Sequence, residues 1–226
     1  MLLFSPYRRI SEVPPSKVWE VTLSVLQQWG HIKSFRFDNG RPFGDPKRET
    51  ISPLALRLIA YGSQVIFNPP RTPTRNAKVE RCQGTTGRWS DPKNCPNIEL
   101  FQQQLDYAVK AQRERFKTRV CKGKTRSEFY PALANNPNAF DQRDFQLHRV
   151  WDFLTLGKWY RKVSAVGQIN LFAKKYQLGF QFKGKLITVT LGKQEDRMVW
   201  NCFDESQKLI KQIPADNIND GAYLQL

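Results

Sequence analysis

The chain has 226 residues, with 36 Lys and Arg against 20 Asp and Glu, which gives a formal net charge of +16 at pH 7. This length holds one or two domains that can each bury a core. The charge favours a polyanionic partner, with nucleic acid first and an acidic membrane surface second. Since no apolar run could span a membrane and no signal-peptide pattern is present, the sequence predicts a soluble protein in the cytoplasm, associated with the nucleoid if the source is bacterial.

The cysteines and histidines do not show the paired spacing of a zinc site. The chain holds Cys82, Cys95, Cys121, Cys202, His31 and His148. None of them forms a Cys-x-x-Cys or His-x-x-x-His pair. The sequence therefore predicts reduced structural thiols and no bound zinc.

The first predicted elements are a helix and a strand. Ser16 is placed to cap a helix that ends at Gly30. Its apolar residues recur at helical spacing: Val18, Val21, Val25 and Trp29. Residues 33–37 then alternate polar and aromatic side chains, which is the period of a half-buried strand, and this strand ends at Asp38.

A second helix and a second strand follow. Residues 53–62 form an apolar helical run stopped by a glycine, and residues 64–67 read as a short strand. The order strand, helix, strand predicts a parallel α/β unit. Three prolines exclude a helix over residues 68–76, and a new helix begins at Ala77 with Glu80 in its first turn. Because functional groups collect beyond the carboxyl ends of strands, we expect Asp38 and Glu80 to meet at one site.

Three motifs in this region occur together. They are Asp38-Asn39-Gly40 after a strand, Asn68-Pro69-Pro70-Arg71-x-Pro73, and Asn76-x-x-Val79-Glu80-Arg81-x-x-Gly84-Thr85. The combination, from Asp38 to Trp89, resembles the catalytic core of integrase-like transposases, whose fold is similar to ribonuclease H and whose site is an Asp, Asp, Glu triad. The resemblance implies an α/β core of that type.

Carried over by resemblance, Asp38 matches the second aspartate of the triad and Glu80 its glutamate, as catalytic and metal-binding residues. The family cleaves DNA and transfers strands with two divalent ions, Mg²⁺ or Mn²⁺ as its substitute. No residue resembles the first aspartate, because the only acids before Asp38 are Glu12 in a proline-flanked loop and Glu20 on a helix. The chain thus resembles a partial core that lacks its first strands, and we expect it to be inactive or impaired in catalysis.

Each acid also has a plain structural interpretation. Asp-Asn-Gly is a strong turn former, which would explain Asp38 without chemistry. An acid in the first turn of a helix is stabilised by the helix dipole, which would explain Glu80.

Basic residues around these acids are the predicted contacts to DNA phosphates. Five of them flank Glu80: Arg71, Arg75, Lys78, Arg81 and Arg88. A further helix is predicted over residues 98–119, and its far end carries Arg113 and Lys117 among eight cations between Lys110 and Arg126 that face one acid, Glu114. A solvated helix face would usually mix the signs, so this end is also predicted to contact phosphates.

From Lys158 the apolar period changes to two and glycines separate several short strands, which predicts a small antiparallel barrel. It resembles the SH3-like barrel that follows the core in integrases and Mu-type transposases. No acid lies between Phe153 and Gln194, so one barrel face should be positive and bind DNA through Lys158, Arg161, Lys162, Lys174 and Lys175. Aromatic residues lie between these cations and could stack on bases, although packing in the core is their more frequent role: Trp159, Tyr160, Tyr176, Phe180 and Phe182.

The predicted organisation is a partial integrase catalytic core over residues 1–120, a helical linker over 121–157 and a small β-barrel over 158–226. The leading interpretation is a DNA transposase or integrase, or a descendant of one, that acts on double-stranded DNA at element ends and target and forms a homo-oligomer there. No membrane or small-molecule partner is expected. The alternative is a non-catalytic DNA-binding regulator or a remnant of a mobile element, and a ribonuclease H-like nuclease is a third, weaker interpretation.

Overall fold

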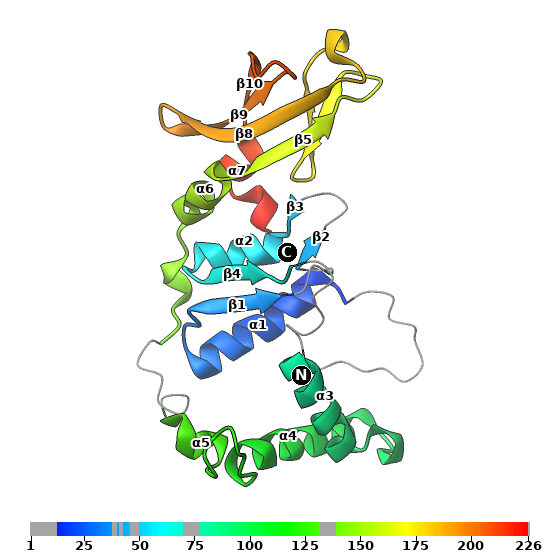
Figure 1. Cartoon of the computed structure of the whole chain (residues 1–226), viewed down its shortest axis with the longest axis vertical. Helices are drawn as coiled ribbons and strands as arrows, with labels where there is room; N and C mark the ends of the chain where they lie inside the picture. Colours follow the sequence, from blue (N-terminus) through cyan, green and yellow to red (C-terminus); the bar gives the residue numbers. More distant parts are fainter. Residues whose placement is uncertain are drawn as a thin grey trace. The chain divides into compact units, whose positions relative to one another are not determined.

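The computed structural model describes residues 13–37, 40, 43–45, 50–69, 77–131 and 139–225, which form a mixed α/β structure (Figure 1). It separates into two compact units, and each is described by itself. Unit 1 comprises residues 1–32 and 67–141, and unit 2 comprises residues 33–66 and 142–226. The domain ranges expected from the sequence divide the chain elsewhere, and they stay a prediction. Within the described ranges, no helix is long and apolar enough to cross a membrane.

The described part of unit 1 is helical. It contains α1 (Pro15–Trp29), α3 (Ala77–Ser90), the short 3-10 turn η2 (Pro92–Asn94), α4 (Ile98–Glu114) and α5 (Arg126–Phe129). The predicted start of α1 was wrong by two residues: the helix begins at Pro15, so Ser16 lies inside it and does not cap it. Proline fits there because the first helical N–H has no partner within the helix. Gly30 ends α1 as predicted, with a φ of 78°.

The helix α4 is fixed at both ends by local hydrogen bonds. At its start the Asn97 side chain accepts from the backbone N–H of Leu100 at 2.8 Å, which caps the helix. It ends at Glu114 and not at residue 119 as predicted. The reason lies in the following residues, where the chain turns back and the N–H of Thr118 donates to the carbonyl of Lys124 at 3.1 Å. The buried face of α4 follows the helical period: Phe101, Leu105, Ala108 and Gln112.

Unit 2 begins with the predicted strand, helix and strand. These are β1 (Ser34–Phe37), α2 (Pro53–Ala60) and β4 (Gln64–Phe67), with the short antiparallel pair β2 (Gly44–Asp45) and β3 (Thr50–Ile51) between them. The strands β1 and β4 are neighbours in one sheet. The N–H of Gln64 donates to the carbonyl of Lys33 at 2.9 Å, which places the starts of both strands side by side, as in a parallel pair. The parallel unit predicted from the sequence is therefore present.

The larger part of unit 2 is an antiparallel sheet with one hairpin beside it. The sheet has the strand order β10 (Leu209–Pro214), β9 (Arg197–Phe203), β8 (Leu186–Gln194) and β5 (Lys158–Lys162). The hairpin is formed by β6 (Gln168–Leu171) and β7 (Lys174–Gln177). The helix α6 (Leu147–Thr155) precedes these strands, η5 (Phe180–Phe182) lies between β7 and β8, and α7 (Asp216–Asn219) and η6 (Ala222–Leu224) follow the last strand. We call residues 158–215 the sheet module.

Aromatic side chains fill the core of the sheet module. The rings of Phe172 and Trp200 stack with centroids 5.4 Å apart, and Trp159 meets both edge-on at 5.3 and 5.4 Å. Gly157 makes room for this arrangement, because a Cβ there would lie 2.6 Å from the Trp159 ring. A residue with a side chain at position 157 would displace the ring, so a glycine is needed there for Trp159 to pack in the core.

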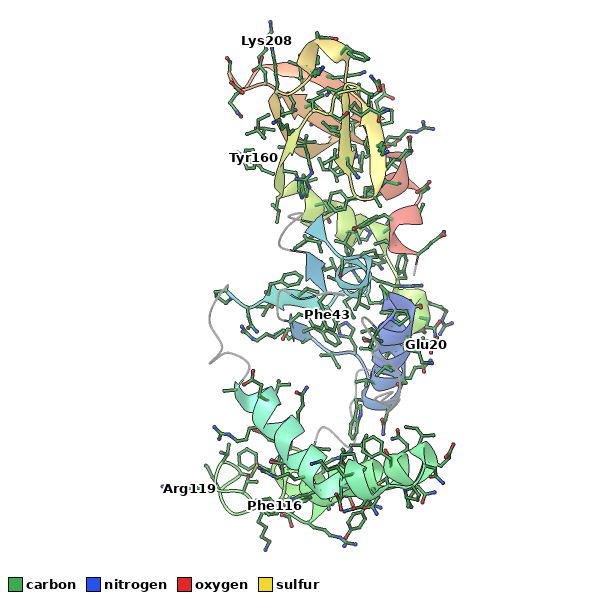
Figure 2. All side chains as sticks on the ribbon, turned by 90° about the vertical axis from the view of Figure 1, so that its right-hand side faces the viewer. Glu20, Phe43, Phe116, Arg119, Tyr160 and Lys208 are labelled. Carbon is green, nitrogen blue, oxygen red and sulfur yellow. The ribbon has the colours of Figure 1, made fainter. Side chains whose placement is uncertain are left out.

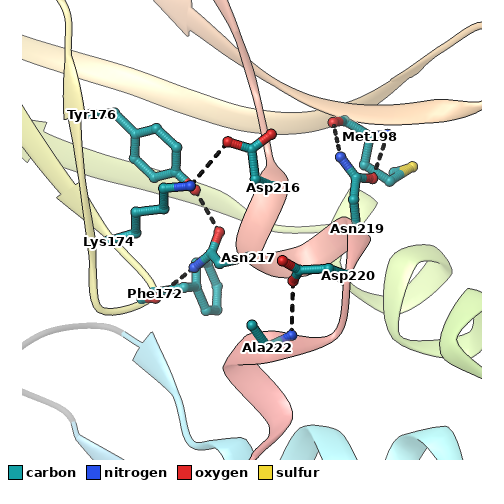
Figure 3. Close-up of polar contacts among 9 residues, drawn as sticks. All are labelled: Phe172, Lys174, Tyr176, Met198, Asp216, Asn217, Asn219, Asp220 and Ala222. Atoms are coloured by element: carbon teal, nitrogen blue, oxygen red, sulfur yellow. Dashed lines mark hydrogen bonds and ion pairs between the residues drawn. The ribbon is translucent and has the colours of Figure 1, made fainter.

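Two asparagine side chains near the C-terminus, Asn217 and Asn219, form hydrogen bonds to the hairpin and to the sheet, respectively (Figure 3). The Asn217 amide donates to the carbonyl of Phe172 at 2.7 Å and its oxygen accepts from the Tyr176 hydroxyl. The Asn219 side chain pairs with both backbone groups of Met198, at 2.8 and 3.0 Å. These bonds satisfy polar groups that would otherwise be buried without partners. No local sequence pattern predicts these contacts, because their partners lie far apart in the chain.

Candidate nucleic-acid interface

The structure tests only part of the predicted catalytic site. Glu80 lies in the first turn of α3, as predicted, and its side chain is exposed. Asp38 lies outside the described residues, so its meeting with Glu80 stays a prediction. Among the residues that the structure describes, no group of three or more His, Cys, Asp or Glu side chains could hold a metal ion. Of the two carboxylates predicted to bind a divalent ion, only Glu80 lies within the described residues. The binding of a metal ion therefore also stays a prediction.

Two of the five cations predicted around Glu80 can be placed. Arg81 and Arg88 are both exposed on α3, seven residues and therefore about two turns apart, so they lie on one side of the helix. Arg71 and Arg75 lie outside the described residues, as does the Lys78 side chain. An exposed, basic helix face next to Glu80 is consistent with the predicted contact to phosphates.

The basic end of α4 divides into cations that hold the fold and cations that face solvent. The Arg113 guanidinium lies over the Trp29 ring, 4.6 Å from its centroid. Arg126 donates to the carbonyl of Gln112 at 2.6 Å. Both side chains are half-buried, so Arg113 has a structural role that the sequence did not reveal. Six other cations of this segment are exposed: Lys110, Arg115, Lys117, Arg119, Lys122 and Lys124.

Most of these exposed cations stand on a closed turn formed by residues 115–124, which we call the basic turn. Its centre is anchored by Cys121, whose side chain is buried and whose N–H donates to the Thr118 carbonyl at 3.1 Å. Lys122 and Gly123 adopt left-handed backbone conformations that reverse the chain. Figure 2 shows Arg119 projecting outward from this turn. The turn therefore presents several cations on a backbone fixed by hydrogen bonds.

The turn is followed by a capping box at the start of α5. The Glu128 carboxylate accepts from the N–H of Thr125 at 2.7 Å, and the Thr125 hydroxyl accepts from the N–H of Glu128 at 3.2 Å. The hydrogen bond from the Thr125 backbone, aided by Lys117 and Lys124, lowers the pKa of Glu128 below its ordinary value. The Glu128 carboxylate, which follows the basic turn, is thus occupied by the cap.

Four lysines of the sheet module lie at the edge formed by β5 and the turn before β8. The strand β5 alternates, with Trp159 buried and Lys158, Tyr160 and Lys162 facing solvent. The turn that carries Lys183 and Lys185 joins the end of this strand through two backbone hydrogen bonds to Val163, at 2.9 and 3.0 Å. We call Lys158, Lys162, Lys183 and Lys185 the basic edge. All four side chains are exposed, and no acidic residue lies anywhere in residues 154–194.

Two of the cations predicted to bind DNA in this region make contacts within the protein. Arg161 donates from its guanidinium to the carbonyls of Asn170 and Tyr160, at 3.1 and 2.8 Å, and so ties β6 to β5. Lys174 forms an ion pair with Asp216 at 2.9 Å. Lys175 is exposed, and its contact with DNA stays a prediction. Sequence spacing alone cannot separate these two uses of a cation, because the partners Asn170 and Asp216 come from other elements of the fold.

The five aromatic residues between these cations differ in how far they are exposed to solvent. Trp159 and Tyr176 are buried in the core, each with 4% of its surface exposed. Phe182 is half-buried beneath Lys185, whose ammonium lies 5.9 Å from the ring centroid. Tyr160 and Phe180 are exposed, at 52% and 67%. Only the last two rings are therefore accessible to a base.

Comparisons with known proteins find matches among solved structures only. No protein-family model matches the chain, and no curated protein matches it. Among solved structures, the chain is similar to one in the cryoEM structure of simian T-cell lymphotropic virus intasome in complex with PP2A regulatory subunit B56 gamma. The TM-score is 0.41 at 14% sequence identity, and the match covers 89% of this chain and 65% of the other. A similarity this distant does not by itself establish a shared fold or activity.

Proposed function

We propose that this chain binds double-stranded DNA and belongs to DNA recombination of the integrase-like transposase type. The observation that carries the proposal is the basic edge, four exposed lysines on a part of the chain that contains no acid. Neutralising DNA phosphates releases counterions, so such a surface favours nucleic acid over other partners. The exposed cations of the basic turn and the pair Arg81 and Arg88 support the same partner.

The recombination part of the proposal rests on the motif sequence and on two elements of the structure. The parallel strands β1 and β4 with α2 between them would form a fragment of a ribonuclease H-like sheet, and α3 begins at Ala77, next to the motif residue Asn76. The antiparallel strands β5 to β10 are compatible with an SH3-like barrel. We propose these two architectures, with the boundaries of residues 1–120, 121–157 and 158–226, as the functional division of the chain.

Asp38 and Glu80 are the residues that would hold Mg²⁺ or Mn²⁺, which would activate the attacking oxygen and stabilise the leaving one. Arg81 and Arg88 would orient the DNA backbone beside Glu80. The 226 residues contain no counterpart of the family's first aspartate, so we propose DNA binding as the activity of this chain and cleavage as absent or impaired. A homo-oligomer formed on DNA is part of the proposal.

The binding claim is tested by fluorescence anisotropy with a labelled duplex over a range of KCl concentrations. The variant Lys158→Gln/Lys162→Gln should lower the affinity about 10-fold near 0.1 M salt and reduce the salt slope by about 2, because each lost phosphate contact removes roughly 0.9. The control is Lys193→Gln/Lys208→Gln, whose cations stand near the acids Glu195 and Asp204 in the sequence. Equal losses in both variants, or no binding by the parent protein, would refute the claim.

The catalytic claim needs a separate assay. Asp38→Asn and Glu80→Gln should leave duplex binding within about 2-fold of the parent, because both residues are proposed to serve chemistry. Plasmid nicking with Mg²⁺ or Mn²⁺ then decides between the two interpretations. Nicking by the parent that is lost in Glu80→Gln would show a working site, and no nicking by the parent with intact binding would favour the non-catalytic interpretation.

A further inference from the structure

The exposed face of β5 carries an aromatic ring between two lysines. Lys158, Tyr160 and Lys162 alternate with inward-facing residues and therefore point to the same side of the sheet. Resting on the proposed binding of DNA, we infer that this face binds unpaired nucleotides: Tyr160 stacks on a base, and the two lysines contact the flanking phosphates.

The surroundings of Tyr160 leave its ring available. Across the strand pair, Tyr160 lies opposite Thr188 and Lys158 lies opposite Thr190, and both neighbours are small. With 52% of its surface exposed, the tyrosine is open to solvent, although the neighbouring Trp159 is buried. Figure 2 shows the Tyr160 side chain at the surface of the sheet module. The ring therefore does not contribute to the core, and its removal should leave the fold intact.

The spacing of the three residues suits an extended strand of nucleic acid. Alternate residues of a β-strand stand about 6.7 Å apart, so the two lysines are separated by roughly 13 Å with the ring midway. Single-stranded binding sites of this kind combine cations that follow the backbone with aromatic rings on which bases stack. Leu186 lies opposite Lys162 and is 50% exposed, which extends the apolar surface beside the ring.

Stacking restricts the ligand to unpaired bases. In a continuous duplex both faces of every base are covered by neighbouring pairs, so a side chain at the surface reaches only phosphates and groove edges. An overhang, a frayed end or a single strand exposes the base faces that Tyr160 needs. The lysines of the basic edge contact phosphates in either form. The ring should therefore distinguish the two forms, whereas the charges should not.

The test compares a labelled oligothymidine with a duplex of equal length, in the full chain and by anisotropy. Tyr160→Ile removes the ring but keeps a residue favoured in strands, and Tyr160→Phe keeps the ring. Tyr160→Ile should weaken oligothymidine binding about 5-fold or more and change duplex binding less than about 2-fold. Tyr160→Phe should retain both affinities. The matched control is Tyr107→Ile, an exposed tyrosine of α4.

The outcomes separate this inference from the proposed function. Equal effects of Tyr160→Ile on both ligands, no effect on either, or an equal effect of Tyr107→Ile would overturn the inference and leave duplex binding standing. A parent protein that binds oligothymidine but not the duplex would refute the proposed function and leave the inferred binding of unpaired nucleotides at Tyr160 standing. Circular-dichroism melting of each variant shows whether the fold is intact, and Tyr160→Phe tests the ring even where Tyr160→Ile unfolds.

Discussion

The hydroxyl of Tyr176 donates a hydrogen bond to the side-chain oxygen of Asn217, inside unit 2 and 41 positions away in the sequence. Through the same asparagine the hairpin of β6 and β7 is tied to α7, because its amide donates to the carbonyl of Phe172. Both asparagine and tyrosine are buried. The bond therefore fixes the hairpin that carries Lys174 and Lys175 relative to the end of the chain.

Replacing Asn217 should destabilise unit 2 strongly. Asn217→Ala leaves the Tyr176 hydroxyl and the Phe172 carbonyl buried without partners, which costs about 2 to 4 kcal/mol of unfolding free energy. Urea unfolding followed by the fluorescence of Trp159 and Trp200 measures the loss. Asn170→Ala is the control, because that side chain is exposed and a change below about 0.5 kcal/mol is expected. A similar loss in both variants would contradict the role given to Asn217.

The burial of Tyr176 predicts a loss of stability in alkali. Burial raises its pKa from 10.0 to about 12, because the charged form is disfavoured away from water. The folded state therefore holds the proton more tightly than the unfolded state. The resulting stability is fully present below pH 10 and is lost as the pH rises toward 12, at about 1.4 kcal/mol for each pH unit.

Urea midpoints measured in steps above pH 9 test this pH dependence, with tyrosinate absorbance as a second readout. Tyr176→Phe should have a shallower decline than the parent, although burial also raises the pKa of Tyr223 to about 12 and that of Cys202 to about 11, so a decline remains. Tyr107→Phe should match the parent, because this tyrosine is exposed. Ionisation of every tyrosine of the folded protein near pH 10 would show that the prediction is wrong.

Local sequence patterns are sufficient to predict which helices and strands form, but not the residues at which they begin and end. Hydrophobic period and punctuating glycines predicted α2, β4 and the strands after Lys158, because both features are encoded within a few neighbouring residues. The end of α4 at Glu114 was missed, since it depends on a turn closed by Thr118 and Lys124. The start of α1 was missed because Ser16 and Pro15 both suit a helix start.

The sequence predicts an excess of positive charge at the candidate interface, but not which of the cations are exposed on its surface. The sequence shows cations without acids, but Arg113, Arg161 and Lys174 bind partners from distant segments, and only the fold reveals those partners. Similarly, Trp159 and Tyr160 are adjacent aromatic residues that the sequence does not distinguish. The alternation of inward and outward side chains along β5 decides that Trp159 is buried and Tyr160 is exposed. The meeting of Asp38 and Glu80 stays a prediction from motif order.

Two glycines with similar positive φ values should respond differently to substitution. Gly167 and Gly184 have φ values of 73° and 77°, so alanine is strained at both positions. A Cβ at Gly167 would also lie 2.7 Å from the backbone of Gly179, whereas at Gly184 nothing lies within 4 Å. We expect a loss of about 1 kcal/mol for Gly184→Ala and about 3 kcal/mol or more for Gly167→Ala. Equal losses in urea unfolding would contradict the close approach.

The capping box predicts a titration that can be followed at one residue. Because the N–H of Thr125 binds the carboxylate of Glu128, the pKa of that glutamate lies below its ordinary value of 4.5. Its contribution to stability is present above pH 4.5 and is lost as the pH falls through the lowered pKa. Carboxyl NMR should show the low pKa. In Thr125→Val, which lacks the hydroxyl but keeps the backbone N–H, the pKa should rise part of the way toward the ordinary value. An unchanged pKa would mean that the backbone N–H, Lys117 and Lys124 cause the shift without the hydroxyl.

The basic turn should contribute to DNA binding through charge alone. In Lys117→Gln/Arg119→Gln/Lys122→Gln, the slope of log affinity against log salt concentration should fall by about 3, since three exposed cations no longer contact phosphates. Arg113→Gln is the matched control, because its guanidinium packs on Trp29 and its loss should reduce stability by about 1 kcal/mol with little change in slope. Anisotropy over a salt series measures both slopes, and melting measures both stabilities. If Arg113→Gln changed the slope as much per charge as the triple variant, the division between structural and exposed cations in this segment would be wrong.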